Sequence, residues 1–156
     1  MLAMQSNLAN TYANLGRFEE VLSMRQKIYS GGLKIRGKEH GHTISAALNY
    51  AGSLIELERF KEARSLLRKT VPVARRVLGE NHEHTLRMRS TYAEAFYMDD
   101  GAALDGLREA VTTLEDTARI ARRVLGSSHP LTPAIERYLQ KARAALRARE
   151  TPQATE

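Results

Sequence analysis

Apolar residues recur every three or four positions along most of the chain, and the pattern is clearest between residues 44 and 78. This spacing places apolar side chains on one face of an α-helix and predicts two amphipathic helices here. Only Glu58-Arg59 separates them, so we expect antiparallel packing. Pro72 lies inside the second stretch, but the pattern continues past it in phase, which predicts a kink and not a break. The two stripes consist of Ile44, Ala47, Leu48, Ala51, Leu54 and Leu57, and of Phe60, Ala63, Leu66, Leu67, Val71, Ala74, Val77 and Leu78.

The segment before this pair predicts a similar pair with a weak point. Residues 2–15 carry a helical apolar pattern that Gly16 ends. A second helix is expected over residues 18–29. Residues 30–32, Ser-Gly-Gly, then predict a frayed or bent turn, because each glycine costs about 1 kcal/mol relative to alanine in a helix. The helix is expected to resume and to end at Gly37.

The remainder of the chain predicts a third pair and one closing helix. The third pair opens at Thr85, and its alignment with the second pair places five extra residues between Asp99 and Gly106. The closing helix is expected over residues 132–149. A polar tail at 151–156 follows, and we expect it to be disordered.

A short phrase, Gly-x-x-His-x-x-Thr, occurs three times at the joins between these pairs. Successive copies are 42 and 47 residues apart, within the period of about 20–50 residues that is typical of stacked-repeat proteins. We interpret the glycine as the end of a helix, the histidine as a turn residue and the threonine as the N-cap of the next helix. The copies are Gly37, His40 and Thr43; Gly79, His82 and Thr85; and Gly126, His129 and Thr132.

This repeat predicts an all-α fold, a right-handed superhelical solenoid of helix–turn–helix units in a single domain over residues 1–150. The units are about 2–42, 43–84 and 85–131, and the closing helix completes the stack. Neighbouring units cover apolar faces that no pair can bury alone. The first helix of each pair is expected to line the inner, concave face.

Three groups of residues recur with the units and carry a family resemblance. They include Asn7-Leu8-Ala9 with Tyr12, Asn49-Tyr50-Ala51, Gly16-Arg17-Phe18-Glu19-Glu20, Arg59-Phe60-Lys61-Glu62-Ala63, Arg76-Val77-Leu78-Gly79 with His82, and Val124-Leu125-Gly126 with His129-Pro130. Over about residues 2–148 they resemble the tetratricopeptide repeats of kinesin light chains. The resemblance implies a groove for a partner peptide, whose backbone is held by the amides at the Asn7 and Asn49 positions. The chain shows three such units and no heptad coiled coil.

The candidate binding residues lie on the predicted inner face of the first helices. Asparagine is a poor helix former, so several on one flank need a reason. One is that an amide donates to and accepts from an extended peptide; the other is that these amides bridge neighbouring helices. Basic residues toward the C-terminal end suit an acidic peptide, or they are ordinary surface charge. The candidates are Asn7, Asn10, Asn14, Asn49, Arg87, Glu94, Arg137 and Lys141.

Composition narrows the function classes. The chain is 42% hydrophobic and 27% charged, with no cysteine, which fits a folded protein without disulfides or thiolate metal sites. No apolar run reaches the roughly 18 residues that span a membrane, and no secretory signal is visible, so we expect a cytoplasmic protein. No catalytic constellation or phosphate loop is found, so we expect no enzyme and no cofactor. The repeated histidines fall on separate loops, so we expect no metal site.

Two further features leave alternatives open. The net charge is +6, and Arg75-Arg76 and Arg122-Arg123 either complement negative helix ends or bind nucleic acid or another phosphate-bearing partner. No aromatic residues interleave these arginines, which favours the first reading. At the N-terminal edge, Leu2, Leu8 and Tyr12 predict either a longer repeat array or a protein partner that covers them in a larger complex.

Overall fold

Helices follow one another along the whole described part of the chain, which in this computed structural model covers residues 16–151. The predicted helix at 2–15 and most of the polar tail lie outside the described residues. Within the described part there are helices and no strands. The helices are α2 (Phe18–Arg36), α3 (Gly41–Glu56), α4 (Phe60–Val77), α5 (Glu83–Tyr97), α6 (Leu104–Val124) and α7 (Leu131–Glu150).

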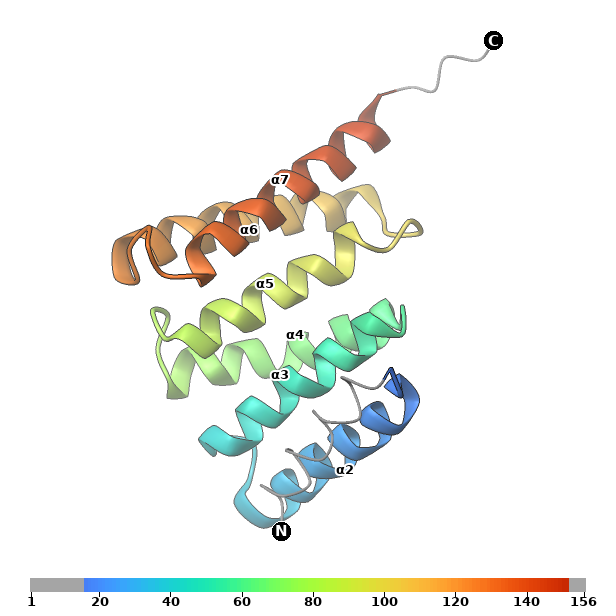
Figure 1. The fold of residues 1–156 in the computed structure, drawn as a ribbon, viewed down its shortest axis with the longest axis vertical. Helices are drawn as coiled ribbons and strands as arrows, with labels where there is room; N and C mark the ends of the chain where they lie inside the picture. Colours follow the sequence, from blue (N-terminus) through green and yellow to red (C-terminus); the bar gives the residue numbers. More distant parts are fainter. Residues whose placement is uncertain (1–15, 152–156) are drawn as a thin grey trace.

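The helices form two layers. Each helix packs against the next in sequence, and in addition α3 packs against α5 and α5 against α7. No such contact joins α2, α4 and α6 to one another within the described residues. Figure 1 shows α3, α5 and α7 side by side in the nearer layer, with α4 and α6 behind. The layer whose helices approach each other is the inner side of a curved stack, so the predicted solenoid is confirmed and its concave face belongs to α3, α5 and α7.

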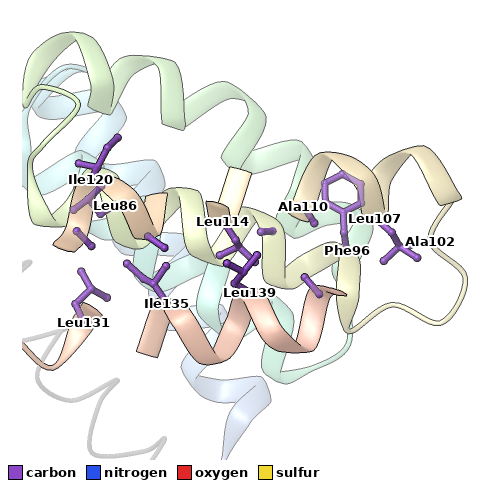
Figure 2. Packing of buried hydrophobic residues seen from close by; sticks show 14 residues of the cluster. Leu86, Phe96, Ala102, Leu107, Ala110, Leu114, Ile120, Leu131, Ile135 and Leu139 are labelled. Atoms are coloured by element: carbon purple, nitrogen blue, oxygen red, sulfur yellow. The ribbon is translucent and has the colours of Figure 1, made fainter. Parts of the chain in front are cut away.

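The core runs continuously through the stack, as the two predicted stripes require. Ile44, Leu67 and Met88 are buried in one cluster that joins α3, α4 and α5. A larger cluster joins α5, α6 and α7 (Figure 2). Its labelled residues include Leu86, Leu114, Ile135 and Leu139. Each such side chain contributes about 1.5–3 kcal/mol by leaving water, and each cluster spans a join between units. The pairs therefore stabilise one another.

The predicted fray at residues 30–32 is wrong. Helix α2 continues without interruption to Arg36. Gly32 is buried against α3, and a Cβ atom at this position would lie 3.1 Å from Oγ1 of Thr43. Packing against α3 overrides the low helix propensity of the glycines. The end at Gly37 is confirmed: its φ is 83°, and its N–H donates to the carbonyl of Gly32 at 3.1 Å.

The predicted threonine N-caps are also wrong, because the histidines cap the helices instead. Nδ1 of His40 accepts from the N–H of His42 at 3.2 Å, and Nδ1 of His82 accepts from the N–H of His84 at 3.1 Å. The helices thus begin before the threonines, at Gly41 and Glu83. Thr43 and Thr85 are buried in the first turn.

The third copy of the phrase follows the same rule with one change. Pro130 is the N-cap of α7, and Nδ1 of His129 accepts from the N–H of Leu131 at 3.2 Å. Thr132 is therefore not the cap. Its hydroxyl donates to the carbonyl of Gly126 at 2.8 Å and so ties the new helix to the end of the old one.

The extra residues of the third unit lie close to where the sequence places them. The connection between α5 and α6 covers residues 98–103, whereas residues 57–59 connect α3 to α4. Arg64 of α4 pairs with Asp99 at 3.0 Å, and Arg149 of α7 donates to the carbonyls of Asp100 and Ala102 at 2.6 and 2.7 Å. The longer connection is thus held from both sides. Helix α4 passes through Pro72 unbroken, as predicted.

Candidate functional site

A hollow of about 400 Å³ lies on the concave face and touches all three inner helices. Helices α3 and α5 form most of its wall, and α7 closes one side. Because each helix presents one flank to the hollow, residues from three different units meet there. Its lining residues are Leu48, Asn49, Gly52, His84, Arg87, Ser90, Thr91, Glu94, Leu131 and Tyr138.

The structure brings three of the predicted site residues together in this hollow: Asn49 from α3, and Arg87 and Glu94 from α5. Arg137 and Lys141 are exposed on α7 and are not among the lining residues. The remaining predicted residues, Asn7, Asn10 and Asn14, lie outside the described residues.

Asn49 presents its amide to the hollow with its backbone braced from behind. Arg25 of α2 donates to the backbone carbonyl of Asn49 at 3.3 Å and to Oγ of Ser53 at 2.6 Å. The Asn49 side chain is exposed and makes no hydrogen bond to any of the described residues. An amide in this state is able to donate to and accept from the backbone of a bound peptide.

Arg87 does not add an unpaired positive charge. Its guanidinium contacts the Glu83 carboxylate one turn earlier, through Nε at 3.0 Å and Nη2 at 2.7 Å. This pairing lowers the pKa of Glu83. Nε2 of His129 lies 3.9 Å from the same carboxylate. The rim of the hollow near Arg87 is therefore a neutral pair in which the arginine is positioned by its partner.

Glu94 is the most desolvated carboxylate of the hollow. Burial raises its pKa, the charge of Glu56 raises it further, and Lys141 opposes the shift. Burial also raises the pKa of the neighbouring Tyr97, with Glu94 and Tyr138 adding to the effect. A carboxylate held at low hydration among phenol rings is stabilised by any cation or hydrogen-bond donor that enters the hollow.

Two lining residues, His84 and Leu131, escaped the sequence reasoning. His84 lies three positions before Arg87 and seven before Thr91, so helical spacing alone places it on the same flank. Burial lowers the pKa of its imidazole, and the neighbouring His82 adds to this. Leu131 was hidden because the closing helix was expected to begin one residue later.

Comparison with protein families identifies the repeat. Two tetratricopeptide repeat models match the chain, one over residues 42–104 and the other over residues 102–131. The chain belongs to the tetratricopeptide repeat family. The matched stretch runs from the start of α3 to the start of α7, and it includes the part of the hollow formed by α3 and α5.

Solved tetratricopeptide structures of kinesin light chain type share this fold. The TPR-like repeats of such a protein from Podosopora anserina superpose with a TM-score of 0.81 at 24% identity, and a variant of it does so at 26%. In both cases the match covers 92% of this chain and 66% of the other. BtubC (BKLC) from P. vanneervenii gives a TM-score of 0.59 at 14% identity, over 99% of this chain and 66% of the other. The likeness is one of structure, and no curated protein matches the sequence.

The arginine pairs of this tetratricopeptide chain have partners on the protein itself. Arg75 contacts Glu80, Arg76 contacts Glu39 and Arg122 contacts Glu136. Arg123 donates to the side-chain oxygen of Asn81 at 3.5 Å. All four lie in the last turn of a helix, where cations complement the negative end. These contacts favour the structural reading of the pairs over a phosphate-binding surface.

Within residues 16–151 no group of three or more histidines and carboxylates is placed to hold a metal ion. The capping role of His40, His82 and His129 occupies the Nδ1 atom of each. In the same part of the chain no helix is long and apolar enough to cross a membrane.

Proposed function

We propose that the protein is a non-catalytic interaction module whose concave face binds a peptide or helix of a partner protein. The observation that carries this proposal is the hollow of about 400 Å³ that touches α3, α5 and α7. Such a surface offers polar groups from several repeats to one ligand, as peptide recognition requires. The partner is sought in the cytoplasm, and the module is a scaffold of kinesin light chain type that works within a larger complex or array.

The inner face has a distinct role for each group of side chains. The Asn49 amide holds the backbone of the bound segment, and the desolvated Glu94 accepts a donor from it. Beyond the hollow, exposed basic residues of α7 attract an acidic part of the same segment. The proposed contact residues are Asn7, Asn10, Asn14, Asn49, Arg87, Glu94, Arg137 and Lys141.

Affinity capture tests the proposal. The full chain is immobilised, proteins from the native source are recovered and identified, and the partner is then purified and titrated by calorimetry. Asn49→Ala is expected to weaken its binding by about tenfold, as for loss of a central contact. Gln26→Ala is the matched control, since it removes an exposed amide from the outer helix α2. Equal affinity of the two variants for the partner would contradict the assignment of the groove.

A further inference from the structure

Two crevices lie between consecutive outer helices, and they occupy equivalent places in neighbouring units. The filled crevice lies between α4 and α6. Arg89 of α5 occupies it, with only 10% of the side chain exposed. Its Nη2 lies 2.5 Å from Oδ2 of Asp116, and its Nη1 lies 3.8 Å from Oε2 of Glu80. A charged head on an apolar stem thus sits between two opposite charges.

The open crevice lies between α2 and α4 and has the reverse chemistry. Ala47 stands one period before Arg89, so the filling side chain is missing. Lys38 stands where the next unit has Glu80, and Lys69 stands where it has Asp116. Both lysines line a cavity of about 300 Å³, and among the described residues no ion pair involves either of them.

The walls of the open crevice are mainly apolar. Tyr29 and Leu33 come from α2, Ile44 from α3 and Val73 from α4. Thr43 also lines it, and its buried hydroxyl has no hydrogen-bond partner, whereas the equivalent Thr85 donates to the carbonyl of Ala74 at 3.4 Å. A cavity of this size is at the lower end for small-molecule sites, which combine apolar walls with a few polar anchors.

We propose that the open crevice binds a small organic acid, with its apolar body between Tyr29 and Val73 and its carboxylate between Lys38 and Lys69. The filled crevice is the template for this arrangement: there an apolar stem carries a cation to two carboxylates, and here the charges are exchanged. Two ammonium groups at the rim of an apolar cavity favour a carboxylate over an amine of the same shape. This site lies on the outer helices and is independent of the concave groove.

Binding is tested on the full chain by NMR titration with two probes of one shape, 4-phenylbutanoate and 4-phenylbutan-1-amine. The acid is expected to shift the amide signals of Thr43, Ile44 and Thr70, and to leave those of Asn49 and Thr91 on the concave face unchanged. The amine is expected to bind at least about tenfold more weakly, because it meets two like charges. Equal binding of both probes, or shifts confined to the concave face, would overturn the proposal.

Charge reversal provides the decisive variant. Lys38 and Lys69 are exposed, so Lys38→Glu with Lys69→Glu leaves the core intact. It is expected to weaken the acid by about tenfold or more and to create binding of the amine. Lys34→Glu with Lys61→Glu is the control, since it makes the same change of net charge on α2 and α4 at residues that do not line the crevice. Loss of acid binding in the control, or none in the crevice variant, would contradict the site. As a second check, Ala47→Arg with Lys38→Glu and Lys69→Asp fills the crevice and should abolish binding of both probes.

Discussion

The open and filled crevices occupy one position in the fold and are built with opposite charges. In the filled crevice the chain supplies its own occupant, and Arg89 joins α5 to α6 and to the turn after α4. In the open crevice a small residue, Ala47, leaves a cavity with two lysines at its rim. The helices around the two crevices begin and end at matching phrases. Only the side chains that project between the outer helices differ.

This difference teaches that the repeat separates framework from content. The capping histidines, the terminal glycines and the small buried alanines set the spacing of the helices, and they are the same in both units. A crevice left unfilled gives up the packing and ion pairs that an internal side chain would add. Unused stability of this kind is common where a surface is kept for binding.

The largest effect is expected when the occupant alone is transplanted. Ala47→Arg places a guanidinium at a buried position between two lysines, and we expect it to lower the free energy of unfolding by about 3 kcal/mol, as for an uncompensated buried charge. Adding Lys38→Glu and Lys69→Asp should restore at least half of the loss, because it recreates the arrangement around Arg89. Urea unfolding of the single, double and triple variants measures this coupling. A triple variant no more stable than Ala47→Arg would show that the crevices are not equivalent.

Removing the natural occupant gives the converse effect. Arg89→Ala leaves a cavity beside two carboxylates and is expected to cost about 2 kcal/mol of unfolding free energy. The loss is below that of a fully buried pair because Asp116 and Glu80 keep 35% and 47% of their side-chain exposure. Millimolar propylguanidine should raise the melting temperature of this variant and not that of the wild type. An equal effect of propylamine would mean that charge alone, without the guanidinium shape, fills the cavity.

The sequence predicted the framework well because the framework is local. Helical periodicity located the helices, and the glycines at 37, 79 and 126 end them with φ of 83°, 97° and 82°. The caps were misassigned because histidine and threonine stand three residues apart and both carry an acceptor suited to a helix N-terminus. Propensity alone decides the choice poorly once tertiary packing buries the threonine.

The candidate site was only partly accessible from the sequence. Arg87 and Glu94 are seven residues apart, so their common flank follows from helix geometry, but their meeting with Asn49 depends on how α3 and α5 stack. The pairing of Arg87 with Glu83 was readable as an i, i+4 pair. The open crevice was not readable from local pattern, because Lys38 and Lys69 come from different elements. Alignment of the units does reveal the exchange of Ala47 for Arg89.

A smaller effect separates the carboxylate of the filled crevice from that of the concave hollow. Hydrogen bonds from Arg89, and then Arg119, lower the pKa of Asp116. Its contribution to stability is therefore present above the usual pKa and is lost as the pH falls below about 4. The pKa of Glu94 is raised, so its ionisation opposes folding at neutral pH and this cost disappears on acidification.

Paired variants measure this contrast. At pH 7 Asp116→Asn is expected to destabilise by about 1 kcal/mol, a value reduced by the partial exposure of the side chain. Glu94→Gln is expected to stabilise by about 0.5 kcal/mol, because it removes a poorly hydrated charge. Both differences from the wild type should shrink as the pH is lowered to about 3. A Glu94→Gln effect that is constant with pH would assign it to packing and not to charge.

The smallest expected effect lies where the two crevices meet their first helix turns. Gly32 is equivalent to Ala74, and each lies against a buried threonine, Thr43 or Thr85. A Cβ at Gly32 would approach Oγ1 of Thr43 to 3.1 Å, which is tight, but the second unit already holds an alanine beside its threonine. We therefore expect Gly32→Ala to stabilise by about 0.5 kcal/mol, since relief of the glycine penalty in α2 exceeds a small shift of Thr43.

Thermal unfolding of Gly32→Ala, with Gly31→Ala as the control, tests this sign. Gly31 lies in the same turn of α2 and is less buried, so its substitution reports the helix-propensity gain of α2 without the contact to Thr43. The difference between the two variants is then the cost of the close approach. A destabilised Gly32→Ala beside a stabilised Gly31→Ala would show that α2 and α3 sit closer together than α4 and α5. The narrow spacing, and not the missing arginine alone, would then set the shape of the open crevice.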